Sequence, residues 1–319
     1  MAILDAIKTL RANLQNSIIG QPELIDALLI SLLADGHLLV EGAPGLAKTK
    51  AIKTLADHME GSFQRIQFTP DLLPADITGS EMYRAQTGEF VFQQGPLFHN
   101  LILADEINRA PAKVQSALLE AMAERQITVS GKTYPLEKLF LVMATQNPIE
   151  QEGTYTLPEA QLDRFLMHVR LDYPNAAAEQ KILRLARGEA LHLNTQIAEK
   201  ISAQVIFAAR DEVMKLHLSE RVEEYIVQLI MATRKPEAYG EDLRNWLDYG
   251  ASPRGTIALE RVARAHAYLN GKDYVSPDDV QAVVHSVLRH RIIVSFDAQA
   301  VGMNADKILN EIIMRVPVA

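Results

Sequence analysis

Short apolar runs and helical repeats alternate through the first half of the chain. The apolar runs that predict strands cover residues 37–41, 63–68, 101–104, 140–144 and 167–171. Between the third and the fourth run, apolar side chains from Val114 to Met122 recur at the spacing of one helix face. Strands that alternate with helices form βαβ units, so this pattern predicts a mainly parallel sheet that is buried on both faces.

The pattern changes near Tyr173, after which we find no convincing strand. Helical stretches follow, separated by Pro236, Gly240, Gly250 and Gly271. Ser-Pro pairs at 252–253 and 276–277 place a capping serine before a proline, an arrangement typical of a helix start. We therefore predict an α/β domain over residues 1–174 and an all-α domain over residues 175–319.

Composition and charge narrow the class of protein. Of the 319 residues, 48% are hydrophobic and 23% are charged, which excludes a disordered, collagen-like or low-complexity chain. Asp and Glu number 40 against 32 Lys and Arg, and the net charge of −8 argues against a protein that coats nucleic acid, although a local basic loop is compatible with it. The chain has no Cys, which rules out disulfides and thiolate metal sites.

Targeting and membrane segments are not evident in the pattern. The first residues, Met1 to Lys8, carry charges within their apolar stretch and do not resemble a signal peptide. No uncharged apolar run approaches the roughly 18 residues that a membrane-spanning helix needs. We therefore expect a soluble, cytoplasmic protein with no direct membrane insertion.

A glycine-rich segment directly after the first predicted strand is a candidate phosphate site. It resembles the Walker A motif, G-x-x-x-x-G-K-[ST], and consists of Gly42, Ala43, Pro44, Gly45, Leu46, Ala47, Lys48 and Thr49. Small residues let backbone N–H groups surround an anion, and the helix predicted to follow adds the positive end of its dipole. We expect Lys48 to reach the β- and γ-phosphates of ATP and the Thr49 hydroxyl to ligate Mg²⁺.

Ala47 departs from the motif, in which Gly usually occupies this position. If the backbone there needs a positive φ, an alanine is strained. If Ala47 lies just inside the helix, alanine is favourable. We favour the second interpretation, because Lys48 and Thr49 belong to the predicted helix.

Two acidic residues end the third apolar run. Asp105 and Glu106 follow Leu101-Ile-Leu-Ala104 and resemble the Walker B motif. In that interpretation Asp105 holds Mg²⁺ through water, and Glu106 orients and deprotonates the attacking water as general base. The alternative is a solvated turn after a strand, and the neighbouring Walker A segment favours the first interpretation.

The polar end of the next strand and the segment before the first strand resemble further parts of AAA+ ATPases. Asn147 resembles sensor 1 and would polarise the water or touch the γ-phosphate, although an Asn before Pro148 is also typical of a turn. Ile19 and Gly20 lie in a segment that resembles the one packing its backbone against adenine. A helix-to-turn junction before Pro22 explains that segment nearly as well.

Two arginines resemble AAA+ elements that act across a subunit or domain boundary. Arg164 precedes the fifth strand and is the candidate arginine finger, whose cation at the γ-phosphate is worth about 10³–10⁵ in rate. The alternative is an intrachain pair with Asp163 or Glu159. Arg254 resembles sensor 2 and falls at the second position of a predicted helix, where the dipole disfavours a cation. That misfit supports a functional role.

Two predicted hairpins are additions to a minimal AAA+ core. They cover about residues 79–95, with a turn at Gly88, and about residues 126–136, with a turn at Ser130-Gly131. They resemble the helix-2 insert and the pre-sensor-1 hairpin that magnesium chelatase, MCM helicase and MoxR ATPases share. In those families such loops face the pore or the rim of a hexameric ring.

Short sequence motifs spread over nearly the whole chain resemble those of the MoxR family. The segments that carry this resemblance are 105–111, 114–122, 144–149, 158–165, 250–255, 274–280 and 287–292. The resemblance implies a P-loop NTPase core with an all-α lid, ATP and Mg²⁺ as cofactors, and tolerance of Ala47. It also implies a hexameric ring chaperone that matures other complexes, including by metal insertion, with a von Willebrand factor A domain partner and an unknown client.

Other functions remain open at this stage. The hairpins allow a nucleic-acid motor, but Lys132 is the one basic residue at the second hairpin turn and the chain is acidic. A magnesium chelatase ATPase subunit and a nucleotide-gated scaffold with negligible turnover are the remaining alternatives. The residues alone leave the role of Arg109 undecided between a neighbouring subunit and an acidic partner. They favour ordinary surface or core roles for His285, His290 and Trp246.

Overall fold

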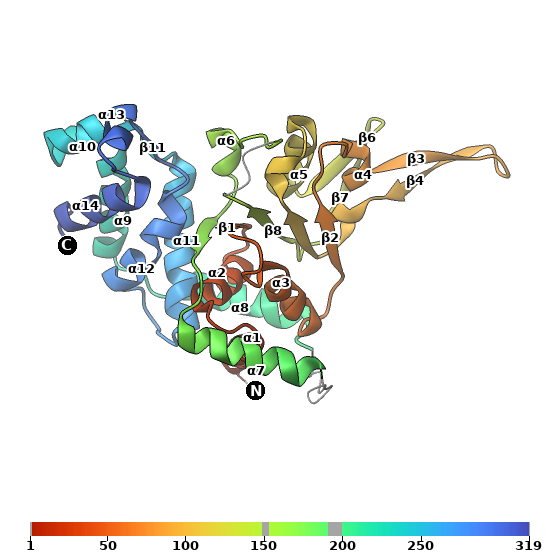
Figure 1. The fold of residues 1–319 in the computed structure, drawn as a ribbon, viewed down its shortest axis with the longest axis horizontal. Helices are drawn as coiled ribbons and strands as arrows, with labels where there is room; N and C mark the ends of the chain where they lie inside the picture. Colours follow the sequence, from red (N-terminus) through yellow and green to blue (C-terminus); the bar gives the residue numbers. More distant parts are fainter. Residues whose placement is uncertain (1, 149–152, 191–199, 319) are drawn as a thin grey trace.

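The computed structural model describes residues 2–148, 153–190 and 200–318. At its centre is a parallel five-stranded sheet in the order β2-β5-β8-β1-β9 (Figure 1). The strands are β1 (Leu38–Gly42), β2 (Phe63–Gln67), β5 (Leu101–Asp105), β8 (Leu141–Gln146) and β9 (Met167–Leu171). The predicted parallel α/β sheet is confirmed.

Both faces of the sheet are buried, and alternate strand residues supply two separate cores. Leu38, Leu101 and Leu141 belong to the larger core, together with α1 (Ile3–Ser17), α2 (Pro22–Leu33) and α3 (Lys48–Asp57). Leu39, Ile102 and Val142 face the smaller core, together with α5 (Ala112–Glu124) and the short α4 (Pro74–Thr78). Continuous apolar runs were therefore needed in these strands, because neither face meets water.

The strand register brings the carboxyl ends of the central strands together. Glu41 at the end of β1 lies opposite Gln146 at the end of β8. Ala104 on β5 lies opposite Ala144 on β8, and Asp105 lies opposite Gln67 on β2. The segments that follow β1, β5 and β8 therefore leave the sheet along one edge, where open α/β sheets bind ligands.

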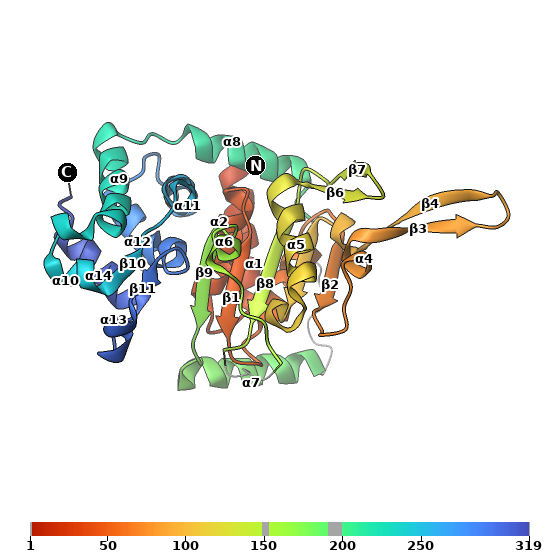
Figure 2. The same cartoon turned by 90° about the horizontal axis from the view of Figure 1, so that it is seen from above.

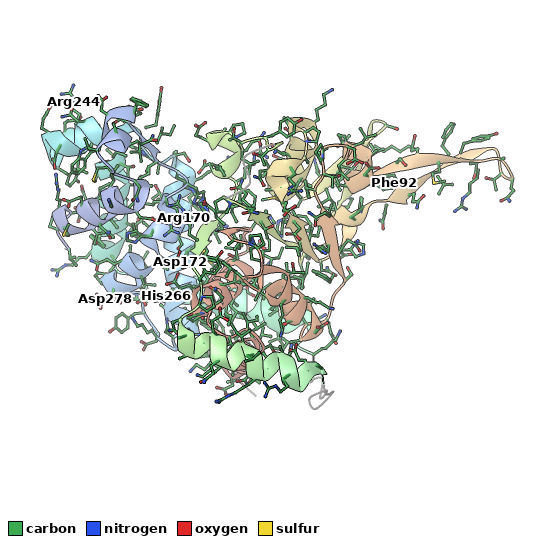
Figure 3. The ribbon with its side chains drawn as sticks, in the orientation of Figure 1. Phe92, Arg170, Asp172, Arg244, His266 and Asp278 are labelled. Carbon is green, nitrogen blue, oxygen red and sulfur yellow. The ribbon has the colours of Figure 1, made fainter. Side chains whose placement is uncertain are left out.

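Two antiparallel hairpins extend from the core on the side away from the C-terminal helices (Figures 1 and 2). The longer one pairs β3 (Gly79–Arg84) with β4 (Glu89–Gln94), and the shorter one pairs β6 (Gln126–Val129) with β7 (Lys132–Pro135). Phe92 of β4, labelled in Figure 3, stacks on Tyr134 of β7 with ring centroids 4.1 Å apart and planes 16° apart. The two hairpins thus contact each other through an aromatic pair.

The chain after β9 is mainly helical. Its helices are α7 (Ala176–Ala190), α8 (Ala203–Lys215), α9 (Glu220–Arg234), α10 (Glu241–Trp246), α11 (Pro253–Leu269), α12 (Pro277–Leu288), α13 (Phe296–Ala300) and α14 (Ala305–Arg315). The expectation of no strand here was wrong in one detail, since β10 (Leu247–Tyr249) pairs with β11 (Ile293–Val294). These segments are too short for a strand periodicity to be recognised. Ser252 and Ser276 cap α11 and α12.

One short helix, α6 (Glu159–Leu162), lies before β9. The described residues also contain three 3₁₀ turns, at Pro96–Phe98, Ile107–Arg109 and Pro236–Ala238. Helix α8 packs against α1, α2 and α11, so it joins the N-terminal helices to the C-terminal ones (Figure 2). Within the described residues, no helix is both long enough and apolar enough to cross a bilayer.

His37, directly before β1, makes the stability of the core depend on pH. Its Nδ1 accepts a hydrogen bond from the Val142 N–H at 3.1 Å, and its Nε2 lies 3.2 Å from the Met122 carbonyl. Burial lowers the pKa of His37 to about 4. In the unfolded chain His37 is therefore protonated below about pH 6.5, whereas in the folded chain it stays neutral down to about pH 4.

We expect the free energy of unfolding to fall by about 3 kcal/mol from this group as the pH drops from 6.5 to 4. In His37→Gln, whose amide can accept and donate similarly, the decrease over this pH range should be smaller by about that amount. Urea unfolding at several pH values measures it. His99→Gln, at a half-buried surface histidine, is the control. Equal pH slopes for His37→Gln and wild type would contradict the assignment.

Candidate functional site

The segment between β1 and α3 is a tight loop in which two residues have positive φ angles. Gly45 has a φ of 86° and Ala47 a φ of 57°. A Cβ at Gly42 would lie 2.9 Å from the Leu171 Cβ on β9, so only glycine fits there. The interpretation that places Ala47 inside the helix is wrong, because Ala47 is the left-handed N-cap residue and α3 begins at Lys48. Alanine there costs about 1 kcal/mol of backbone strain.

Lys48 points back across this loop. Its Nζ donates to the Gly42 carbonyl at 2.6 Å. Burial lowers the pKa of Lys48, and the nearby carboxylates of Asp105 and Glu106 oppose that shift. The lysine ammonium therefore lies in the field of both acidic residues, and the phosphate loop and the acidic pair form one site. Thr49 follows Lys48 in the first turn of α3.

Thr145 on β8 organises the acidic pair. Its Oγ1 donates to Asp105 Oδ1 at 2.6 Å and accepts the Glu106 backbone N–H at 2.9 Å. Arg65 of β2 donates to the other carboxylate oxygen, Asp105 Oδ2, at 2.7 Å. Sequence reasoning missed Thr145 and Arg65. A threonine that directly follows the apolar run ending at Ala144 was the available sequence signal for Thr145.

Glu106 is held by its backbone and by two side chains. It has a φ of 58°, unusual for a residue with a Cβ. Its Oε2 accepts from Gln67 Nε2 at 2.8 Å and lies 3.1 Å from Arg109 Nε. Arg109 therefore has an acidic partner within its own chain, which was one of the two roles considered for it. Asn147 directly follows β8 and is 5% exposed.

A groove lies beside the phosphate loop and is covered by α7. Pro44, Gly45, Leu46 and Ala47 line it on one side, and Ile18, Ile19, Tyr173 and Pro174 line it on another. Lys50 of α3 pairs with Glu189 of α7 at 2.6 Å across it. In Figure 2 the arrows of β1 and β9 point toward α7. Helical periodicity could not predict that α7 would cover the phosphate loop.

Ile19 lines this groove, whereas Gly20 is not among its lining residues. Gly20 has a φ of 81°, and a Cβ there would lie 2.9 Å from the Pro174 Cβ. Gly20 thus allows the turn that brings Ile19 and Pro174 together. The groove has the position and the mainly apolar walls that an adenine ring needs.

Arg164 and Arg254 lie elsewhere, together on a second groove between α5, α11 and the segment that precedes β9. Asp163, Arg261 and Arg291 also line this groove, and it has no lining residue in common with the groove at the phosphate loop. Arg164 Nη1 donates to the Leu119 carbonyl at 2.8 Å, and Arg254 is 58% exposed. The predicted site residues therefore fall into two groups on different surfaces of the chain.

Comparisons with known proteins identify the class. The model of the ATPase family associated with various cellular activities (AAA) matches residues 37–167, and the AAA lid domain matches residues 244–312. Together with the fold and the phosphate loop, these matches define an AAA+ ATPase, an enzyme that binds and hydrolyses ATP.

Close relatives narrow the class to one family. Chaperone MoxR1 of Mycobacterium tuberculosis is 44% identical over 94% of this chain and 78% of its own length. Protein MoxR of Paracoccus denitrificans is 34% identical over 89% of this chain and 87% of its own. A crystal structure of a protein from Cytophaga hutchinsonii, assigned as an ATPase, superimposes with a TM-score of 0.92 and 45% identity, covering 99% of this chain and 96% of that one. The chain belongs to the MoxR family of chaperone-like AAA+ ATPases, as the sequence motifs indicated.

The left-handed backbone at Ala47 makes a stability prediction. In Ala47→Gly, relief of strain offsets the added entropy of the unfolded chain, so the free energy of unfolding should change by less than about 0.5 kcal/mol. The control Ala117→Gly, in the middle of α5, should lose about 1 kcal/mol. Urea unfolding of both variants decides. An equal loss at the two positions would place Ala47 in the helix after all.

Thr145 makes a second prediction. Thr145→Val keeps the volume but removes the hydroxyl that holds Asp105 and Glu106. We expect kcat for ATP hydrolysis to fall about 10- to 100-fold, because the acidic pair loses its alignment, with little change in nucleotide affinity. Thr145→Ser, which keeps the hydroxyl, should retain most activity. If the valine variant hydrolyses ATP at the wild-type rate, the acidic pair does not need Thr145.

Proposed function

We propose that ATP binds with its phosphates in the loop from Gly42 to Thr49 and its adenine in the groove beside Ile19 and Gly20. Backbone N–H groups of the loop and the N-terminus of α3 offer the positive ends that phosphate oxygens need. Lys48, now bonded to Gly42, turns to the β- and γ-phosphates. The apolar groove wall and the pair Lys50–Glu189 enclose the base.

Mg²⁺ fits the residues at the same edge of the sheet. Thr49 and Asp105 offer hydroxyl and carboxylate oxygens, the ligands that Mg²⁺ prefers, and Asp105 already accepts hydrogen bonds from the cation of Arg65. One or two protein oxygens suffice when phosphates and waters complete the shell. When bound, the ion supplies charge neutralisation at the β- and γ-phosphates.

Glu106 serves as the general base that takes a proton from the attacking water. It stands one residue beyond Asp105, with Thr145 fixing its backbone N–H. Gln67 and Arg109 contact its Oε2, so one of the two carboxylate oxygens of Glu106 already has partners within the chain. Asn147, at the end of the neighbouring strand, polarises the water or contacts the γ-phosphate.

The observation that carries the proposal is the separation of the arginines from the phosphate loop. Arg164 and Arg254 share one groove, and the groove at the phosphate loop has other walls. Because these two cations line a groove apart from their own chain's phosphate loop, we infer that they serve the site of a second copy. A heterologous contact of this kind, repeated, gives a ring when the rotation between copies closes. We propose a hexamer in which Arg164 is the finger and Arg254 the sensor 2 cation of the neighbouring site.

The biological role follows the family. We propose a cytoplasmic ring chaperone that uses ATP hydrolysis to remodel or mature other protein complexes, metal-centre insertion included, together with a von Willebrand factor A domain partner. The relatives named as a chaperone and as MoxR proteins support this proposal. In it, residues 1–174 form the nucleotide-binding core, with the hairpins at 79–95 and 126–136 turned to pore or rim, and residues 175–319 form the lid.

A nucleic-acid motor has less support. Lys132, the basic residue of the shorter hairpin, lies 3.5 Å from Glu81 of the longer one, so its charge is offset within the chain. Stimulation of hydrolysis by DNA at low salt would reverse this preference.

The intersubunit site predicts complementation between inactive variants. Arg164→Ala chains should lose about 10³-fold or more in kcat, and Glu106→Gln chains should bind ATP without turnover. A 1:1 mixture should recover activity, because Arg164→Ala phosphate sites receive an intact arginine from Glu106→Gln neighbours. Wild-type specific activity should also rise with protein concentration. A mixture that stays inactive, with wild-type activity independent of concentration, would show that each chain works alone.

A further inference from the structure

The carboxylate of Asp163 lies beside both Arg164 and Arg254 of the second groove. Asp163 directly precedes Arg164 in the chain and contacts Arg254. Asp163 lies between α6 and Arg164. Its Oδ1 accepts from Arg291 Nε at 2.9 Å, and its Oδ2 accepts from Ser252 Oγ at 2.8 Å. Arg254 Nη1 lies 3.8 Å from the same Oδ2. Asp163 thus contacts the end of α12 with one oxygen and the start of α11 with the other.

Arg291 is buried where the sheet meets these helices. Its side chain is 2% exposed, and its Nη1 and Nη2 donate to the carbonyls of Leu166 and Phe165 at 3.2 and 2.6 Å. It also donates to the Val287 carbonyl. Burial lowers the pKa of Arg291 to about 10, still far enough above neutrality for the guanidinium to stay charged. The cation binds the side chain before Arg164 and the backbone after it.

Half-buried Arg164 and exposed Arg254 therefore both take their positions from this buried pair. Arg164 lies between two residues, Asp163 and Phe165, that Arg291 holds. Arg254 is the second residue of α11, whose capping serine is bound by Asp163. We propose that Asp163, anchored by Arg291, is the positioning residue that sets Arg164 and Arg254 at a fixed separation for the γ-phosphate of a neighbouring chain. This inference rests on the proposed intersubunit site.

Asp163 is not alone in attaching the C-terminal helices to the sheet, because a second group of ion pairs does the same. The positioning role can therefore be tested apart from this attachment. Asp306 of α14 pairs with Arg289, directly after α12, at 3.0 Å and with Arg170 of β9 at 3.5 Å. Arg170, labelled in Figure 3, comes from the sheet. Neither Arg289 nor Arg170 is among the residues that line the arginine groove. Asp306→Asn therefore removes a comparable junction without touching the arginine pair.

The test uses the full-length chain. In Asp163→Asn, which keeps the side-chain shape, we expect kcat for ATP to fall about 100-fold, the cost of misplacing a reacting group by about 1 Å, with KM for ATP nearly unchanged. Mixing this variant 1:1 with Glu106→Gln chains should restore about a quarter of the wild-type rate, since about one interface in four then pairs an intact phosphate site with an intact arginine pair. Asp306→Asn should keep wild-type kcat and KM.

The outcomes separate the two proposals. If Arg164→Ala is rescued by Glu106→Gln chains but Asp163→Asn is not, Asp163 serves the fold or its own chain, and the positioning role is overturned while the intersubunit site stands. Wild-type kcat in Asp163→Asn also overturns it. An equal loss of kcat in Asp306→Asn would mean that any weakened junction suffices. If neither Arg164→Ala nor Asp163→Asn is rescued, the intersubunit site itself fails and the positioning role fails with it.

Discussion

The register of the parallel sheet is the constraint on which the nucleotide site depends. The central strands are buried on both faces, so polar chemistry has no place along them and is confined to their ends. Because β1, β5 and β8 run in one direction and in register, the phosphate loop, the acidic pair and Asn147 all leave the sheet at its carboxyl edge. The hydroxyl of Thr145, near the end of β8, then joins β8 to the acidic pair by hydrogen bonds.

This constraint explains what could be predicted from the sequence. Apolar runs and helical repeats predicted the parallel sheet, and residues placed at strand ends were expected to meet. Partners between strands could not be predicted in the same way. Arg65 and Gln67 of β2 bind Asp105, at the end of β5, and Glu106, directly after it. These contacts depend on strand order, which periodicity does not reveal. The left-handed φ of Ala47 depends on how the loop closes, and residue type alone favoured the helix.

The C-terminal helices show a different limit. Their starts at Ser252 and Ser276 carry local signals, and these were recognised. Where a helix packs depends on segments that are distant in the sequence. Helix α7 covers the phosphate loop, and α8 lies against the N-terminal helices α1 and α2. The ion pair between Asp163 and Arg291 joins residues 128 positions apart, so neither a motif nor a spacing pointed to it.

The aromatic stack between the hairpins has a mechanical consequence. The longer hairpin projects far from the core, with Met82, Tyr83 and Phe90 exposed along it. Phe92 of β4 stacks on Tyr134 of β7, so a force on the longer hairpin has a direct contact through which to reach the shorter one. The strand that follows β7 in the chain is β8, which contains Thr145 and is followed directly by Asn147. The hairpin with these exposed apolar side chains is thus linked, through Tyr134 and the segment after β7, to the strand that aligns the acidic pair.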